Sequence, residues 1–215
     1  MWQRSPFLLV VMLLLALPTT SNAGELFLDG ALGTAFHTRT TPDGIWWQQP
    51  FPHSFDLTSR AYRAGLGLQV TEHWAITASY VNLGKTRATT EYVEDDDYNH
   101  GRLSGPRQKL VTTDYLSGPQ ITGTYRWTNW TLQPFLSGGV ALLHHTGVAI
   151  NPRAPEERFQ FHFHGDVPML VAEGGICYKW ICGDVTYYRG VHSPNYPIST
   201  EAIVSMIGVK VPLPF

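Results

Sequence analysis

Along this chain, segments in which apolar and polar residues alternate one by one are joined by connections that are short and long in turn. Apolar and polar side chains alternate clearly in 62–70, 74–80, 115–127 and 130–142, and less strictly in 26–36, 168–180, 181–190 and 201–215. Alternation of this kind is typical of strands with one buried face, so we expect eight strands of about ten to fifteen residues. Three connections are short, at 71–73, 128–129 and around 179–180, whereas four are long, at 38–57, 93–113, 146–164 and 191–200.

Successive connections of an up-and-down sheet lie at opposite ends of the strands, so the long connections all fall on one side. A soluble sandwich or lipocalin has no reason to collect its long loops at one end, whereas a bacterial transmembrane barrel combines short periplasmic turns with longer extracellular loops. The sequence therefore predicts an all-β fold, an eight-stranded antiparallel up-and-down transmembrane β-barrel with four long extracellular loops and three short periplasmic turns. The alternative is a soluble sheet with one solvated face.

The two faces of the predicted strands differ in chemistry. One carries bulky apolar and aromatic residues, such as Leu66, Ile76 and Ile121, and the other carries Gly, Ser, Thr, Gln and charges. A membrane barrel turns its apolar face to lipid, and eight strands leave an interior that side chains can fill. We therefore expect a narrow, plugged lumen in which acids and bases pair. Its polar residues are expected to be Asp29, Arg63, Gln120, Arg126, Gln133, Glu173, Lys179, Asp184 and Lys210.

Aromatic residues mark both ends of the predicted strands. Four tryptophans flank the short turns, and four tyrosines lie on or beyond the opposite ends. They are Trp74, Trp127, Trp130 and Trp180, and Tyr62, Tyr80, Tyr92 and Tyr115. Because amphipathic rings prefer headgroup depth, these residues predict two girdles about 25 Å apart.

Residues 1–23 have the features of a secretory signal peptide. Arg4 supplies the basic start, the apolar core runs from Phe7 to Leu17, and small residues stand at 21–23. A helix of that core length reaches about 17 Å, which is too short for a bilayer of about 30 Å. We expect a mature barrel at 24–215 that is exported to the periplasm and inserted into the outer membrane of a Gram-negative cell.

The charge composition argues against one class of partner. The chain has 15 Lys and Arg against 17 Asp and Glu, a formal net charge of −2, and no basic stripe. We therefore expect no nucleic-acid partner.

The two cysteines flank the short turn at Lys179 and Trp180. If these two residues form the turn, Cys177 faces Cys182 as a non-hydrogen-bonded pair with Cα atoms about 4.5 Å apart. That spacing lies at the short limit of disulfide geometry, and the periplasm is oxidising. The pattern predicts a disulfide. Two free thiols in a longer turn are the alternative.

The strands resemble the eight-stranded outer-membrane β-barrel family of the OmpA transmembrane-domain type. The resemblance rests on Gly65-Leu66-Gly67-Leu68 leading into 74–80, on 133–140, and on the alternating end of the chain. A terminal Phe after alternating apolar residues resembles the signal by which the barrel-assembly machinery recognises this family. The matching residues are Ile207, Val209, Val211, Leu213 and Phe215. Larger members carry a peptidoglycan-binding domain after the barrel, which we do not expect here.

Histidines gather in or beside the predicted long loops. His162 and His164 share one strand face, and His144 closes the same hairpin. Imidazoles grouped in this way suit a transition metal, and they equally suit a polar collar that meets lipopolysaccharide phosphates. Because no third ligand is fixed by the spacing, we assign no metal site.

Two classes of function are open. Small barrels of the lipid A deacylase type, which this chain resembles in size and signal peptide, use a His-x-Ser pair. Here His53-Ser54 and His192-Ser193 are adjacent, and adjacent strand residues face opposite sides. We therefore expect no enzyme, no catalytic residue and no cofactor, but a structural or loop-mediated surface-binding role. The lipid A acyl hydrolase remains the alternative.

The expected partners follow from the location. They are outer-membrane lipid and lipopolysaccharide, together with the barrel-assembly machinery during biogenesis. The protein is expected to be a monomer.

Overall fold

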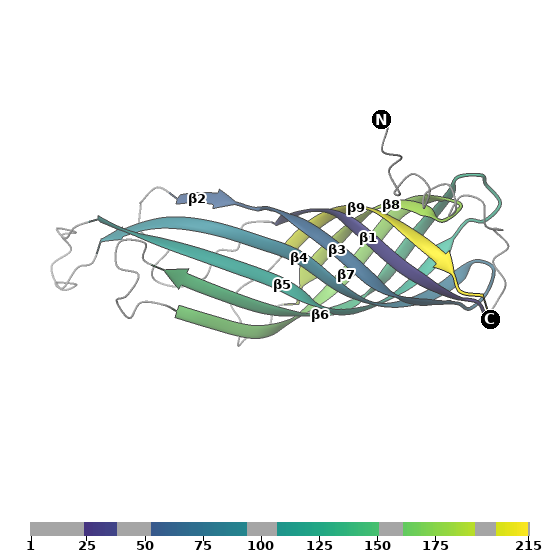
Figure 1. Cartoon of the computed structure of the whole chain (residues 1–215), viewed down its shortest axis with the longest axis horizontal. Helices are drawn as coiled ribbons and strands as arrows, with labels where there is room; N and C mark the ends of the chain where they lie inside the picture. The colour runs from purple at the N-terminus through teal and green to yellow at the C-terminus, as the bar shows by residue number, and fades with distance from the viewer. Residues whose placement is uncertain (1–23, 38–52, 94–106, 151–160, 192–200, 215) are drawn as a thin grey trace, which may run out of the picture.

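The computed structural model describes residues 24–37, 53–93, 107–150, 161–191 and 201–214, which form one antiparallel sheet closed on itself (Figure 1). Its elements are β1 (Leu26–His37), β2 (His53–Asp56), β3 (Thr58–Gln69), β4 (Trp74–Val93), β5 (Arg107–Arg126), β6 (Gln133–Ile150), β7 (Phe161–Tyr178), β8 (Ile181–Gly190) and β9 (Glu201–Pro212). β2 and β3 both pair with β4 and are two parts of one strand, so the barrel has eight strands. Pairing of β1 with β9 and of β4 with β5 closes it, as predicted. The described residues contain no helix long and apolar enough to cross a membrane.

Four strands are longer than the expected ten to fifteen residues. β4 and β5 have 20 residues each, and β6 and β7 have 18 each. β5 begins at Arg107 and β7 at Phe161, both inside segments that we predicted as loops. At about 3.3 Å per residue and a tilt of about 45°, twenty residues rise about 47 Å, against an apolar band of about 25 Å. In Figure 1, β4–β7 accordingly extend well beyond β8 and β9 at the left. We name the part of β4–β7 that extends beyond β8 and β9, together with β2, the sheet extension.

The outer wall of the barrel is apolar. Leu32 and Ile207 are each 72% exposed, and Leu66, Ile76 and Ile121 are each more than half exposed. Such a continuous apolar exterior on a closed sheet is what a transmembrane barrel presents to lipid. The predicted assignment of the two faces is therefore confirmed for these strands.

Glycines let aromatic rings enter the lumen at the end with the short turns. Gly67 lies opposite Phe27 in register, and Gly175 lies opposite Phe135. A Cβ added to Gly67 would lie 2.0 Å from Phe27 Cζ, and one on Gly175 would lie 2.6 Å from Phe135 Cζ. Each ring thus occupies the space that a neighbouring side chain would need.

The aromatic residues largely follow the predicted girdles. Trp74, Trp127 and Trp130 are exposed at the end with the short turns, where Tyr125 packs edge-on against Trp74 at 5.1 Å between ring centroids. Trp180 departs from the prediction, since it is only 6% exposed. At the opposite end the exposed rings are Tyr62, Tyr80 and Tyr115. The side chain of Tyr92 lies outside the described residues.

Candidate functional site

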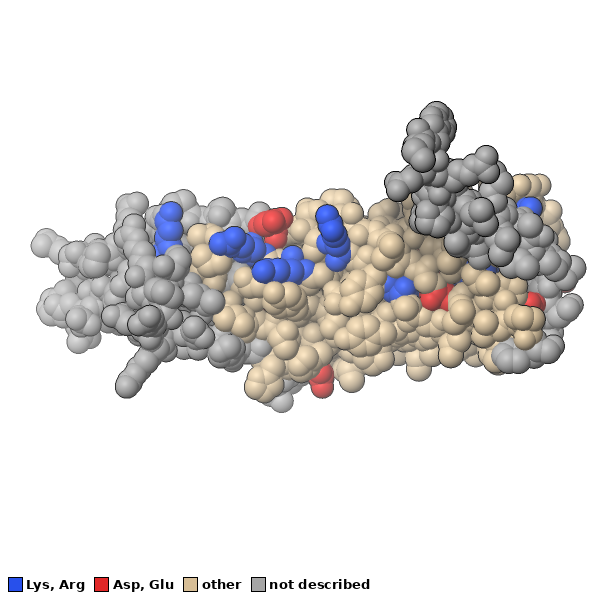
Figure 2. All heavy atoms as spheres, in the orientation of Figure 1, with Lys and Arg blue, Asp and Glu red and all other residues tan. Residues whose placement is uncertain are grey.

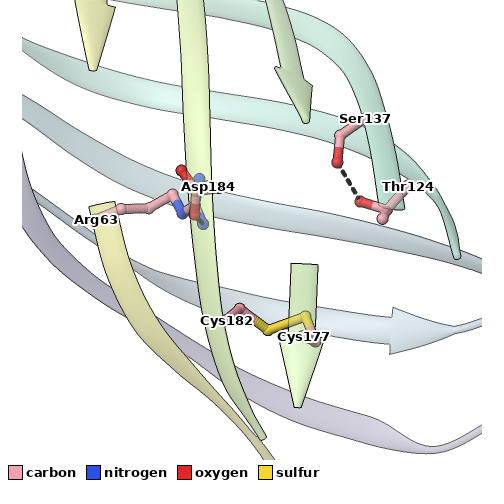
Figure 3. Close-up of a disulfide and its surroundings, with 6 residues drawn as sticks. All are labelled: Arg63, Thr124, Ser137, Cys177, Cys182 and Asp184. Carbon is pink, nitrogen blue, oxygen red and sulfur yellow. Dashed lines mark hydrogen bonds and ion pairs between the residues drawn. A yellow bond between two sulfur atoms is a disulfide. The ribbon is translucent and has the colours of Figure 1, made fainter. Parts of the chain in front are cut away.

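A buried ion cluster centred on Arg63 joins four strands across the lumen. Arg63 on β3 donates from Nε to Asp29 Oδ2 on β1 at 2.8 Å and from Nη2 to Asp184 Oδ2 on β8 at 3.2 Å. Its Nη1 lies 3.2 Å from Glu173 Oε2 on β7. All four side chains are at most 4% exposed. Figure 3 shows Arg63 reaching toward Asp184 from the facing strand. Acids and bases therefore pair across the lumen, as predicted.

Two further cations in the lumen balance the negative charge of this cluster. Lys210 is buried with its Nζ 4.8 Å from the Phe135 ring centroid, and Arg126 lies at the end of β5 beside a short turn. Together with Arg63 they match the three buried carboxylates in number. The Thr124 and Ser137 hydroxyls are hydrogen-bonded at 2.9 Å (Figure 3).

The prediction that Lys179 lies in the lumen is wrong. Lys179 is exposed in the β7–β8 turn with φ of 53°, and its Nζ lies 6.0 Å from the Tyr178 ring centroid. The two-residue turn takes Lys179 out of the strand alternation, so the face rule no longer applies to it. Gln133, at the start of β6, is half-buried.

In the half of the lumen away from the short turns, the buried side chains are apolar rather than polar. The lumen face of the strands was predicted to carry Gly, Ser, Thr, Gln and charges, and in this half that prediction is wrong. We call these residues the apolar layer: Val81, Leu83, Leu116, Leu143, Val167, Met169, Val171, Val204 and Met206, each at most 7% exposed. Tyr188 packs with them and donates its hydroxyl to Gln120 Oε1 at 2.8 Å, where the apolar layer meets the polar half. The signal was present in β7, where Val167, Met169 and Val171 alternate with Leu170, so that both faces are apolar.

A β-bulge lies in β4 at the top of the apolar layer. The register with β5 shifts between Asn82 and Gly84, and Gly84 has φ of 82°. Asn82 Oδ1 accepts the Gly84 N–H at 2.7 Å. The Leu83 carbonyl accepts hydrogen bonds from Ser59 Oγ and, at 3.0 Å, from His37 Nε2. Side chains from β3 and β1 thus satisfy the carbonyl at the bulge.

This arrangement includes a Ser–His contact that the sequence analysis missed. His37 Nε2 lies 3.0 Å from Ser59 Oγ, but the two residues are 22 positions apart and meet only through the β1–β3 register. A serine nucleophile must give its proton to the histidine. Here the Ser59 proton points to the Leu83 carbonyl, and Nε2 faces the same acceptor, so Nε2 carries a proton and donates it. Ser59 and His37 are therefore arranged as hydrogen-bond donors that join neighbouring strands, not as a nucleophile and its base.

The predicted histidine group is not assembled as a metal site in the described residues. His144 Nδ1 contacts Asp166 Oδ1 at 2.9 Å, and His164 lies opposite Thr146 in register. Among the side chains that the structure describes, no group of three or more His, Cys, Asp or Glu has the geometry to hold a metal ion. The side chain of His162 is not among them.

The predicted disulfide is present. Cys177 pairs with Cys182 across β7 and β8, and Tyr178 pairs with Ile181. The Cα atoms of the two cysteines lie 4.1 Å apart, close to the expected spacing, and both side chains are buried in the lumen (Figure 3).

Several predictions fall outside the described residues. These include the signal peptide at 1–23, the terminal Phe215 and most of the segment 38–57. In β9, Ile207 faces outward, and the Leu213 N–H donates to the Leu26 carbonyl at 2.8 Å. The insertion signal itself stays a prediction.

No protein-family model and no curated protein sequence matches this chain. Among solved structures, the outer membrane protein OprG from Pseudomonas aeruginosa has a TM-score of 0.52 and 15% identity, covering 91% of this chain and 98% of OprG. The Ail protein of Yersinia pestis, solved in complex with the heparin analogue sucrose octasulfate, has a TM-score of 0.46 and 12% identity, covering 86% of this chain and 99% of Ail. Neisserial surface protein A has a TM-score of 0.43 and 11% identity, covering 90% and 100%. The fold is that of the eight-stranded outer-membrane β-barrels.

Proposed function

We propose that this protein is an integral outer-membrane barrel that is closed to ions and presents its sheet extension for binding at the cell surface. The observation that carries the proposal is the combination of four strands of 18–20 residues with a cluster of buried apolar side chains in the lumen beneath them. A pore needs an open interior, and a purely structural anchor needs no strands that rise about 20 Å beyond the lipid.

The filled lumen supports the absence of conduction. The apolar layer offers no polar group to replace the hydration shell of an ion, and it follows directly on the buried ion cluster. Protein interiors are packed densely enough that such a layer leaves no continuous water path. In planar bilayers the wild-type protein should therefore show no steady conductance, and the double variant L143A/M169A should conduct more. The outward neighbour supplies a control, L142A. Conductance of porin size in the wild type would contradict a closed lumen.

The proposed orientation places the short turns in the periplasm and the sheet extension outside. Single cysteines in place of Thr113, in the sheet extension, and Thr128, in the β5–β6 turn, test it, because both native cysteines are in the disulfide. On intact cells a membrane-impermeant maleimide should modify the cysteine at Thr113 and leave that at Thr128 unmodified. The opposite result would reverse the topology.

The binding role is tested by shortening the sheet extension along its own register. Arg87 pairs with Thr113, and Thr146 pairs with His164, so each hairpin can be closed at a register pair by a short turn. Cells that express wild-type or shortened protein are compared on surfaces coated with fibronectin, collagen or mucin, with heat-modifiability confirming a folded barrel. We expect shortening to reduce attachment to at least one coating to the level of cells without the gene. Equal attachment to all three would leave a structural role alone.

The remaining parts of the proposal concern biogenesis. Residues 1–23 direct export, the terminal apolar residues are recognised by the barrel-assembly machinery, and the barrel acts as a monomer.

A lipid A hydrolase is not favoured, because the described Ser–His contact is buried inside the wall, whereas acyl chains lie outside it. A lipid A profile of cells with and without the gene tests this point, since a changed acylation pattern would restore the hydrolase.

A further inference from the structure

The bulge in β4 determines which side chains face outward above the apolar belt. Up to the bulge the even-numbered residues face out, as Tyr80 shows by its 49% exposure. Beyond Gly84 the parity reverses, and Lys85 and Arg87 are exposed on the outer wall. Without the extra residue both cations would point into the lumen, because a shift of one residue moves every later side chain to the other face.

A third cation stands beside these two. Arg60 on β3 is exposed, and its backbone adjoins the bulge, since a Cβ on Gly84 would lie 2.3 Å from the Arg60 carbonyl oxygen. Lys85 Nζ lies 5.7 Å from the Tyr115 ring centroid. We call Arg60, Lys85 and Arg87 the basic patch. Figure 2 shows Lys and Arg side chains gathered over β3 and β4 with an acidic side chain beside them, next to a band with few charges.

The basic patch lies directly above aromatic residues that mark headgroup depth. On β3, Tyr62 is the next outward-facing residue after Arg60, on the side of the short turns. The Asn82 side-chain amide donates to the Tyr62 hydroxyl at 3.1 Å. On β4 and β5, Tyr80 donates its hydroxyl to Ser117 Oγ at 2.9 Å. Tyrosine rings with a wet polar end favour the interface between acyl chains and headgroups. The cations therefore stand at the depth of the first charged groups of the lipid.

Among the residues that the structure describes, the cations of the basic patch form no ion pair, unlike two other basic side chains beyond the apolar belt. Arg189 lies 3.7 Å from Glu201, and His144 contacts Asp166. No acidic side chain among the described residues lies within 4.0 Å of the basic patch. Asp56 stands opposite Arg87 in register and offsets part of its charge, although no ion pair within 4.0 Å joins the two side chains. These three exposed cations outnumber the one carboxylate described beside them, so they can form a site for a multiply charged anion on two adjacent strands.

We propose that the basic patch binds the phosphate groups of lipopolysaccharide in the outer leaflet. This inference rests on the outer-membrane location proposed above. Arginine forms paired hydrogen bonds with phosphate oxygens, and lysine adds a mobile point charge. The phosphorylated sugars of lipid A lie just outside the acyl chains, at the level where the basic patch meets the headgroups. Because the patch covers β3 and β4 only, the bound lipid occupies one side of the barrel.

The test compares lipid binding by native mass spectrometry of the full-length barrel in nanodiscs. The lipids are lipid A with two phosphates and the same lipid after dephosphorylation. The proteins are wild type, the triple variant R60Q/K85Q/R87Q, and the control R189Q, which removes a cation paired with Glu201. Each cation near an anionic surface contributes roughly fivefold, so the triple variant should bind diphosphorylated lipid A at least about tenfold more weakly. R189Q should bind within about twofold of wild type.

A salt titration tests the proposal even if the triple variant does not fold. If the triple variant does not fold, binding by the wild type is measured from 0.1 to 1 M salt, over which the screening length falls from about 10 to about 3 Å. Binding of phosphorylated lipid A must weaken over that range. Equal binding of dephosphorylated lipid A, unchanged binding by the folded triple variant, or binding of inorganic phosphate without lipid A would each overturn the proposal. None of these outcomes bears on the closed lumen or the sheet extension, so the proposed function is judged separately.

Discussion

Replacement of Arg63 by Met tests whether the ion cluster holds the lumen together. Arg63 contacts three carboxylates at 2.8–3.2 Å in a site that is at most 4% exposed. Met has similar length and no charge, so R63M removes the cation and retains much of the volume. Asp29, Glu173 and Asp184 would then face one another without a common partner.

The magnitude follows from the imbalance that R63M creates. Removal of one partner from a buried ion pair costs about 3–5 kcal/mol, because the other charge stays buried without compensation. Of the three lumen cations only Lys210 and Arg126 remain, and Lys210 is positioned over the Phe135 ring. We therefore expect R63M to lower the free energy of unfolding by about 3–5 kcal/mol. Addition of E173Q removes one of the three uncompensated acids and should recover at least about 1 kcal/mol.

Urea titration of the barrel in phospholipid vesicles measures these differences, with tryptophan fluorescence and heat-modifiability as two readouts. R189M is the matched control, because Arg189 is 67% exposed beside Glu201 and should cost less than about 1 kcal/mol. If R63M lies within about 1 kcal/mol of wild type, the cluster contributes little. If E173Q lowers the stability of R63M further, the carboxylates are not the source of the cost.

The remaining predictions concern the outer wall, the lumen and the disulfide at the β7–β8 turn. Leu66→Arg should cost about 2–4 kcal/mol in the same titration, because Leu66 is 53% exposed on the lipid-facing wall. Gly67→Ser should also destabilise, by about 1–3 kcal/mol, because its Cβ would lie 2.0 Å from Phe27; a neutral effect would show that the ring moves freely. Alkylation of native protein without reduction should leave Cys177 and Cys182 unmodified in mass spectra, and two modified thiols would rule out the disulfide. Its removal should cost no more than about 2 kcal/mol, since the closed loop is short.

The faces of the strands and the register of the β7–β8 hairpin were predictable because they follow from local geometry. Alternation assigned Leu66 to the outer wall and Asp29 to the lumen without any knowledge of the partner strands. The two-residue turn at 179–180 likewise set the pairing of Cys177 with Cys182. In each case a single rule, side chains on opposite faces at successive positions, carried the information.

The sheet extension was not predictable by the same rule. Outside the bilayer neither face of a strand needs to be apolar, so Thr112 and Thr113 in β5 give no alternation and were assigned to a loop. The apolar layer was missed for the opposite reason. Where Leu142 faces lipid and Leu143 faces the lumen, both faces are apolar and the contrast that defines them disappears.

The bulge joins these two regions and explains why both are needed. Alternation continued through Tyr80 places Lys85 in the lumen, where it would meet the apolar layer without a counter-charge. The extra residue at Gly84 turns Lys85 outward, and it leaves the Leu83 carbonyl to be satisfied by Ser59 and His37 from the neighbouring strands. A bulge of this kind costs ladder hydrogen bonds, so it persists where it changes the direction of side chains usefully. Here it separates an apolar interior from a cationic exterior within one strand, at the level where the barrel leaves the lipid.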